Sequence, residues 1–280
     1  MGHHVAHRLL GGAEQERLDV LDVATPRETH APICRLAADR GLAIICQKPL
    51  APTFAEAESL VADVGNRVRL MVHENWRFRP HYRRIAGWLR DGRVGEVRTV
   101  TMSLFTSGLI ADASGRAPAI ERQPMFATLE RLLVMEVLIH HVDTLRFLLG
   151  PLTLAGASLG RSCALVRGED RASMFMTTAA GAAVSLIGDF MAHGYPVAQR
   201  DRLQMLGTTG AIVLEGENLR LTRGAHIEED IAIDLAANYG ASYVAVLTHF
   251  LDRLDDGGAF ETSPEDNLET LRIVEQVYGL

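Results

Sequence analysis

The sequence predicts an α/β fold, in which part of a doubly wound parallel sheet is followed by an α+β domain with a large, mostly antiparallel sheet. Two observations predict this fold. From residue 18 to residue 72, short buried strands alternate with helices, as in a parallel sheet. From residue 153 to residue 223, strand-like runs follow one another with short turns, as in an antiparallel sheet. Because the pattern changes near residues 76–80, we divide the chain into domains 1–78 and 79–280.

The first domain contains three short apolar runs that are typical of buried strands. Two of them end shortly before a proline, which disfavours continuation of the element. The helices between the strands have apolar residues at helical spacing, and the second helix begins with a capping box of Thr53 and Glu56. The predicted elements, in order, are strand 18–24, helix 28–40, strand 42–46, helix 53–64 and strand 68–72.

The second domain opens with an amphipathic helix and an alternating strand. A polar segment with glycines and prolines follows at 106–127, and a loop of this length often contains a binding site. An apolar helix comes next, then six strand-like runs, then two helices, the last of which is capped by Ser263-Pro264. The predicted elements, in order, are helix 80–91, strand 97–105, helix 129–149, strands 153–165, 171–180, 182–191, 201–207, 210–215 and 218–223, and helices 239–256 and 264–278.

Composition and charge argue against two kinds of partner. The chain has 280 residues, 48% of them hydrophobic and 22% charged, as expected of a globular protein. A formal net charge of −7 argues against nucleic acid and anionic membranes, and no run is apolar enough to span a bilayer. Three cysteines without a Cys-x-x-Cys pair predict free thiols and a cytoplasmic location. His3, His4 and His7 have no acidic or cysteine partner nearby, so we expect no metal site.

The helix predicted at 129–149 contains an unusual set of ionisable residues. It is apolar nearly all round, yet Glu136, His140 and Asp143 share one stripe at α-helical spacing. Ionisable groups are costly in such surroundings unless they are paired or functional. A carboxylate one turn from an imidazole can orient the ring for proton transfer. The helix alone leaves two interpretations open. It is either a proton-transfer site, or a helix with one solvent-exposed face and a histidine whose hydrogen bonds have only a structural role.

Four motifs, taken in order, resemble the Gfo/Idh/MocA family of NAD(P)-dependent oxidoreductases. They are Ala24-Thr25-Pro26 with His30, Gln47-Lys48-Pro49, Asn75 within HENWRFRP, and Glu136-x-x-x-His140-x-x-Asp143. The resemblance covers essentially the whole chain after residue 18. It departs from the usual family pattern at Gln47, where Glu is common, and in the last motif, whose commoner form is Asp-x-Gly-x-His-x-x-Asp.

The resemblance implies an enzyme that transfers a hydride between the nicotinamide of NAD or NADP and a secondary alcohol of a sugar or polyol. Lys48 would donate a hydrogen bond to the reacting oxygen, His140 would take the hydroxyl proton, and Glu136 would accept a hydrogen bond. The implied cofactor-binding residues are Ala24, Thr25, Pro26, His30, Gln47, Lys48 and Asn75. The candidate substrate-binding residues are Arg77, Arg122 and Asp143, and no metal ligand is implied.

Plainer roles stay open for several of these residues. Lys48 can be a solvated lysine in a turn, and Thr25 can be the cap of the next helix. Arg77 and Arg122 can serve as surface or salt-bridge residues. The chain as a whole can be a non-catalytic sugar or nucleotide sensor, or a scaffold protein on the same fold. Because such antiparallel sheets commonly pair between subunits in the family, we also expect a homo-oligomer, a dimer or a tetramer.

The family's Gly-x-Gly-x-x-Gly turn has no counterpart in this sequence. The early glycines, Gly2 and Gly11-Gly12, do not follow a strand. We therefore interpret residues 1–78 as the C-terminal half of a Rossmann-type domain. The chain is then a fragment or a mis-started product of a longer gene, and a genuinely shortened protein with another function is the alternative. Without the glycine turn and its helix N-terminus, we expect NAD(P) to bind weakly or not at all.

Overall fold

A computed structural model describes residues 18–280 and divides them into two compact units. The first unit contains residues 18–78 and 242–275, and the second contains residues 79–241 and 276–280. The break after residue 78 falls where the sequence pattern changes. Residues 242–275, which the sequence assigns to the second domain, pack in the first unit instead. The predictions for the histidines and glycines of residues 1–17 lie outside the described residues.

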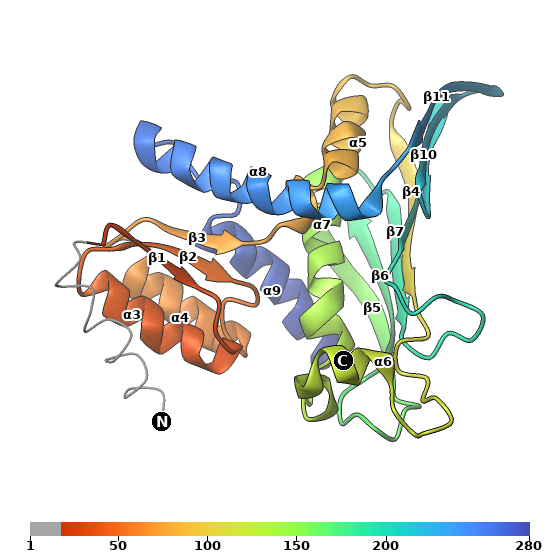
Figure 1. The fold of residues 1–280 in the computed structure, drawn as a ribbon. Helices are drawn as coiled ribbons and strands as arrows, with labels where there is room; N and C mark the ends of the chain where they lie inside the picture. The colour runs from red at the N-terminus through yellow and green to blue at the C-terminus, as the bar shows by residue number, and fades with distance from the viewer. Residues whose placement is uncertain (1–17) are drawn as a thin grey trace. The chain divides into compact units, whose positions relative to one another are not determined.

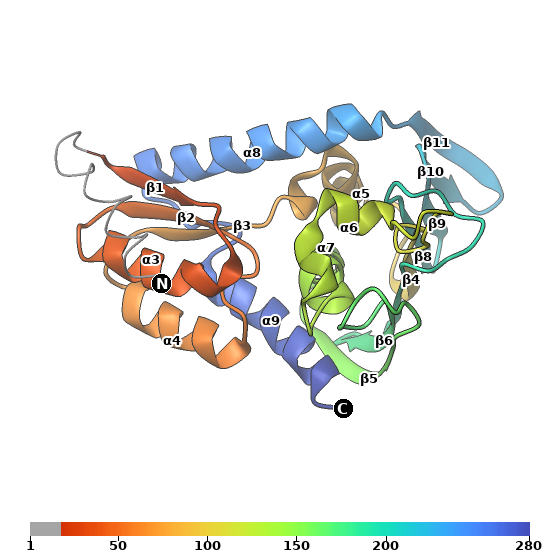
Figure 2. The same cartoon turned by 60° about the horizontal axis from the view of Figure 1, so that its bottom comes forward.

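The first unit is built on a parallel sheet. Its elements are β1 (Val20–Val23), η1 (Arg27–Thr29), α3 (His30–Ala38), β2 (Ala43–Gln47), α4 (Phe54–Val64), β3 (Leu70–His73), η2 (Trp76–Phe78), most of α8 (Leu235–Asp256) and most of α9 (Pro264–Tyr278). The described strands form a three-stranded sheet in the order β1-β2-β3, which confirms the predicted parallel sheet. Helices α3 and α4 lie on one face of this sheet and α8 lies on the other (Figures 1 and 2).

Contacts distant in sequence bring residues 242–275 into the first unit. Their apolar side chains join those of the sheet in one core, made of Ile45, Met71, Phe78, Val246, Phe250 and Phe260. The carbonyl of Thr262 accepts the N–H of Val72 at 2.9 Å, and its hydroxyl donates to the Val72 carbonyl at 2.7 Å. These bonds extend the edge of the sheet beside β3. No local sequence pattern reveals them, since the two residues are 190 positions apart.

The second unit is built on an eight-stranded sheet in the order β11-β10-β9-β8-β4-β7-β6-β5. Its elements are α5 (Pro80–Arg90), β4 (Val97–Phe105), α6 (Pro118–Arg122), η3 (Pro124–Ala127), η4 (Leu133–Leu138), α7 (Ile139–Leu149), β5 (Leu152–Gly160), β6 (Arg171–Thr178), β7 (Ala183–Asp189), β8 (Asp201–Gly207), β9 (Gly210–Glu215), β10 (Asn218–Arg223) and β11 (His226–Ala232). Strand β4 is parallel to β7, and the other neighbours in this sheet are antiparallel. Helices α5 and α7 lie on one face of the sheet (Figure 1).

Several predictions for the second unit differ from the structure. The segment expected to be a loop contains the short helices α6 and η3, each of which begins at a proline. Strand β11 was not predicted, because its sequence HIEEDIA is largely exposed and lacks apolar alternation. The helix expected from residue 129 begins at Leu133, and its first six residues form the π-helix η4.

Between residues 18 and 280, no helix combines the length and hydropathy that a bilayer span requires. Cys34, Cys46 and Cys163 are buried free thiols, as the sequence predicts. A cytoplasmic location stays a prediction.

Candidate active site

The predicted cofactor-binding residues of the first unit gather at one edge of its parallel sheet. Val23 of β1 pairs with Cys46 of β2, and Gln47 pairs with His73 of β3, so the carboxyl ends of the three strands are aligned. The residues that occupy this edge or follow directly from it are Ala24, Thr25, Pro26, Gln47, Lys48 and Asn75. In doubly wound sheets this is the edge at which ligands bind.

His30 lies at the start of α3 and connects two loops of that edge. Its Nε2 atom is 2.8 Å from the carbonyl oxygen of Thr25, and its Nδ1 atom is 2.9 Å from the carbonyl oxygen of Pro49. The side chain is 1% exposed. His30 therefore holds the loops after β1 and β2 together, and its contact with a cofactor stays a prediction.

Lys48 follows β2 directly and is half-buried. It is the sole lysine of the chain, since the other 27 of the 28 basic Lys and Arg residues are arginines. A lysine ammonium is a compact donor that can give a hydrogen bond to a reacting oxygen, whereas an arginine guanidinium suits planar ion pairs. Its occurrence only at this sheet edge, in a chain that uses arginine everywhere else, is a functional signal in the sequence.

Asn75 and Arg77 have partners within the first unit. The Asn75 amide donates to the hydroxyl of Ser242 at 2.9 Å. The Arg77 guanidinium donates to the Glu261 carbonyl at 3.0 Å and to the Asp266 carboxylate at 2.6 Å. The salt-bridge role that the sequence leaves open for Arg77 is thus present, and a substrate contact stays a prediction.

Glu136, His140 and Asp143 lie on consecutive helical segments of the second unit. Glu136 belongs to the π-helix η4, whereas His140 and Asp143 belong to α7. All three side chains are buried, with exposed fractions of 9%, 8% and 0%. A π-turn contains more residues than an α-turn, so the α-helical spacing assumed for Glu136 does not hold. The Thr144 hydroxyl donates to the His140 carbonyl at 2.8 Å.

Two residues missed by the sequence analysis hold the start of η4. The Glu169 carboxylate accepts the N–H of Val134 at 2.9 Å and the N–H of Leu132 at 3.2 Å. The Tyr278 hydroxyl donates to Glu169 at 2.7 Å and accepts the N–H of Met135 at 3.1 Å. These acceptors satisfy amides that a helix start leaves without a partner, so they fix the turn that contains Glu136.

Arg122 lies at the end of α6 and lines a cavity of about 320 Å³ within the second unit. Phe190 forms an aromatic wall of this cavity, and Thr106 and Gln199 line it as well. Phe126 stacks behind Phe190, with the ring centroids 6.2 Å apart. An aromatic wall beside a guanidinium and an amide suits a small polar ligand.

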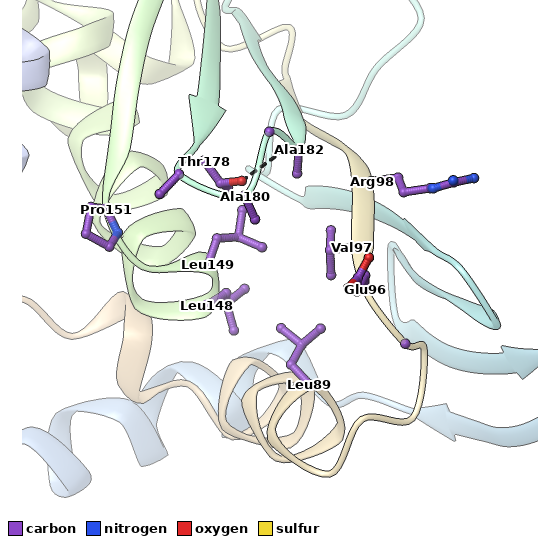
Figure 3. A pocket seen from close by; sticks show the side chains of 13 residues that line it. Leu89, Glu96, Val97, Arg98, Leu148, Leu149, Pro151, Thr178, Ala180 and Ala182 are labelled. Atoms are coloured by element: carbon purple, nitrogen blue, oxygen red, sulfur yellow. Dashed lines mark hydrogen bonds between the residues drawn. The ribbon is translucent and has the colours of Figure 1, made fainter.

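A cavity of about 700 Å³ lies elsewhere in the second unit, between the C-terminal ends of α5 and α7 and the turn from β6 to β7 (Figure 3). Leu89, Leu148 and Leu149 form much of its wall, and the Arg98 side chain points away from it. It contains none of the predicted site residues. Among residues 18–280, no group of three or more His, Cys, Asp or Glu side chains is arranged to hold a metal ion.

A buried histidine–carboxylate contact beside His140 was also missed. His141 is fully buried, and its Nε2 atom is 2.9 Å from Asp201 at the start of β8. The Tyr82 hydroxyl donates to the other Asp201 oxygen at 2.7 Å, and the Arg79 guanidinium lies 3.6 Å from that oxygen. Burial by itself raises the pKa of Asp201, but the charge and hydrogen bond of His141, with Arg79 and Tyr82, hold it well below its ordinary value. This network joins α5, α7 and β8.

Replacing Asp201 with asparagine is expected to lower the free energy of unfolding by about 2 kcal/mol near neutral pH, because a charged hydrogen-bond acceptor is lost. The pKa of Asp201 is lower in the folded chain than in the unfolded one. Its contribution is therefore present above about pH 4 and lost progressively as the pH falls below that value. Urea denaturation near neutral pH and at about pH 3 measures the difference between parent and variant. The exposed Asp91→Asn is the matched control, and an Asp201→Asn effect that is equal at both pH values would contradict the account.

Comparisons with known proteins agree with this architecture. A family model described as "Oxidoreductase family, NAD-binding Rossmann fold" matches residues 3–73, and one described as "GFO/IDH/MocA C-terminal domain" matches residues 82–213. A D-apiose dehydrogenase of Paraburkholderia graminis is 31% identical over 274 residues, which cover 94% of this chain and 71% of that protein. An inositol 2-dehydrogenase of Rhizobium meliloti is 25% identical over 269 residues, covering 92% of this chain and 77% of that protein.

A solved structure shows the same fold over most of the chain. It is an oxidoreductase from Agrobacterium radiobacter in complex with NAD⁺, L-tartaric acid and magnesium, and it is 28% identical in sequence. The TM-score is 0.84, and the match covers 93% of this chain and 77% of that chain.

Proposed function

Because the chain belongs to the Gfo/Idh/MocA family of oxidoreductases, we propose that it transfers a hydride between nicotinamide and a secondary alcohol carbon of a sugar or polyol. One observation carries the proposal: the sole lysine of the chain follows β2 at the ligand-binding edge of a parallel sheet. Relatives that are named D-apiose dehydrogenase and inositol 2-dehydrogenase support the substrate class.

The carboxyl edge of the sheet is the part of the first unit that would hold a dinucleotide. Of the residues at this edge, Ala24 and Pro26 are exposed, and Thr25, Gln47 and Lys48 are half-buried. A ligand can therefore reach these five residues. When bound, the nicotinamide supplies or accepts the hydride. Thr25, Gln47, Lys48 and Asn75 would hold the cofactor, and His30 would keep the two loops in place.

Residues of this chain would accept the hydroxyl proton of the substrate and stabilise the oxygen that loses it. In the oxidation direction His140 would accept the hydroxyl proton at an imidazole nitrogen, which neutral imidazole can do near neutral pH. The Lys48 Nζ atom would donate a hydrogen bond to the same oxygen and stabilise its developing negative charge. Glu136 would accept a hydrogen bond from His140 or from a substrate hydroxyl. Asp143, Arg77 and Arg122 are the proposed substrate contacts, with Arg122 acting from the wall of its cavity.

Purified protein incubated with D-apiose, inositol and related polyols, in the presence of NAD⁺ or NADP⁺, tests this function. We expect reduced nicotinamide to accumulate with at least one of these substrates. Ligand binding without turnover on any sugar or polyol would contradict the enzyme and favour the sensor alternative. Comparison of the two cofactors decides between NAD and NADP.

We further propose that this chain binds NAD(P) weakly or not at all, because the sequence has no Gly-x-Gly-x-x-Gly turn to cradle the pyrophosphate. Isothermal titration of nucleotide into the purified chain measures it. A dissociation constant in the low micromolar range would contradict this prediction.

The open face of the eight-stranded sheet is the proposed oligomer interface. Along β6 and β8 the side chains alternate between buried and exposed, and the exposed set includes Phe175, which is 55% exposed, and Leu206, which is 41% exposed. An apolar patch on a sheet face is typical of a subunit interface. We expect Phe175→Glu to convert a dimer or tetramer into monomers in light scattering. The exposed apolar Val244→Glu on α8 is the control, and an unchanged mass for Phe175→Glu would contradict this interface.

A further inference from the structure

Strands β2 and β3 bring Lys48 next to a carboxylate. Gln47 and His73 are the last residues paired between these parallel strands. The next residue on β2 is Lys48, and the next on β3 is Glu74. Adjacent strands lie about 4.8 Å apart, so the two side chains start from neighbouring positions at the carboxyl edge. Gln47, which precedes Lys48, is uncharged and cannot neutralise the ammonium.

The Glu74 carboxyl is fully buried at this edge. Its Oε1 atom accepts the N–H of Trp76 at 2.9 Å. Burial raises the pKa of Glu74 above its ordinary value, and the Trp76 hydrogen bond and the charge of Lys48, followed by Arg77 and His73, oppose only part of that rise. A buried carboxylate of this kind needs a nearby positive charge to stay ionised.

Of the charged groups that act on Glu74, Lys48 acts most strongly. The Arg77 guanidinium also donates to Asp266 and to the Glu261 carbonyl. His73 is buried, and desolvation lowers its pKa, although Asp22 of β1 and Glu74 act in the opposite direction. Histidine at this position is therefore mostly neutral near neutral pH.

We propose that the Glu74 carboxylate is the counter-charge of the Lys48 ammonium and positions it. Glu74 is a positioning residue in this account, because it acts through Lys48. The catalytic meaning rests on the proposed function, since Lys48 must then donate to the reacting oxygen. The pairing of Glu74 with Lys48 does not rest on the proposed function, and it can be measured without turnover.

The single lysine makes the test specific. Neutral amines react with N-hydroxysuccinimide esters and ammonium groups do not, so the acylation rate of Lys48 reports its protonation. Arginine-directed cleavage releases residues 41–67, which include Lys48, as one peptide separate from the N-terminus. Mass spectrometry of this peptide over a pH series gives the acylation profile in the absence of cofactor and substrate.

Glu74→Gln removes the charge and keeps an acceptor for Trp76. We expect this variant to acylate Lys48 about tenfold faster than the parent at pH values where the parent lysine is mostly protonated, with its profile displaced to lower pH. If the substitution changed only the accessibility of Lys48, the acylation rate would change by the same factor at every pH. Glu74→Asp should stay closer to the parent profile, and Glu58→Gln, an exposed carboxylate on α4, should match it. A Glu74→Gln profile that superimposes on the parent profile overturns the proposal.

Should Glu74→Gln fail to fold, the reciprocal measurement decides. Carboxyl ¹³C NMR follows the titration of Glu74 in the parent and in Lys48→Met. The pKa of Glu74 is expected to be higher in Lys48→Met, because the ammonium that favours the ionised form is gone. Equal pKa values in the two proteins would overturn the pairing. Turnover that is unchanged in Lys48→Ala would instead refute the proposed function and leave the pairing intact.

Discussion

Replacing His140 with alanine is expected to reduce kcat by at least about a hundredfold, the usual contribution of a general acid or base. The imidazole would take the hydroxyl proton as the hydride leaves the carbon, and alanine has no group that can do so. Steady-state kinetics at saturating cofactor and sugar measure the change. We expect a much smaller change in KM, since the lost interaction belongs to the transition state.

Two controls separate chemistry from folding in this experiment. His193 lies exposed in the loop between β7 and β8, so His193→Ala should keep the parent kcat. His140→Gln retains a polar side chain of similar length but cannot act as a base near neutral pH, and it should be as slow as His140→Ala. A kcat within a few-fold of the parent in both His140 variants would refute the assigned base.

The second large effect is expected from Lys48→Ala, which should also lower kcat by about a hundredfold or more. In the proposed mechanism the ammonium would stabilise negative charge on the reacting oxygen, and this charge would develop as the reaction proceeds. Lys48→Arg keeps the charge but replaces a point donor with a planar one, so we expect only partial recovery. Stopped-flow measurement of the hydride-transfer rate, together with steady-state initial rates, compares the parent with Lys48→Ala and Lys48→Arg.

Arg90→Ala is the charge-matched control for Lys48, because the Arg90 side chain is 80% exposed on α5. It should leave kcat unchanged. Addition of a small primary amine to Lys48→Ala should restore part of the lost rate if the ammonium is the missing group. A full parent rate in Lys48→Ala would show that Lys48 is the solvated turn lysine that the sequence leaves open.

The sequence predicted the first unit well because its strands and helices depend on local patterns. Apolar runs stopped by proline gave β1 and β2, and Thr53 caps α4 by accepting the Glu56 N–H at 3.3 Å. The position of Thr25, Gln47 and Asn75 at one edge follows from the parallel order of the strands. The return of Thr262 to β3 could not be predicted, because it depends on bonds between distant residues.

The second unit was less predictable for the same reason. The π-helix that contains Glu136 depends on Glu169 and Tyr278, which are 35 and 143 positions away from the amides they accept. No helical periodicity encodes such partners. The Asp201 and His141 pair joins residues 60 positions apart, and each looks like an ordinary polar residue in its own segment. Glu74 was visible beside Asn75 in the quoted motif, but only the strand register, which pairs the preceding residues Gln47 and His73, relates it to Lys48.

A crystal structure with nicotinamide cofactor and a sugar or polyol bound is the most direct test of the central claim, which is that Lys48 and His140 serve one oxygen. We expect the Lys48 Nζ atom and an imidazole nitrogen of His140 both to lie within about 3 Å of the same substrate hydroxyl. Side chains that contact different ligand atoms, or a His140 ring sealed from the ligand, would contradict it.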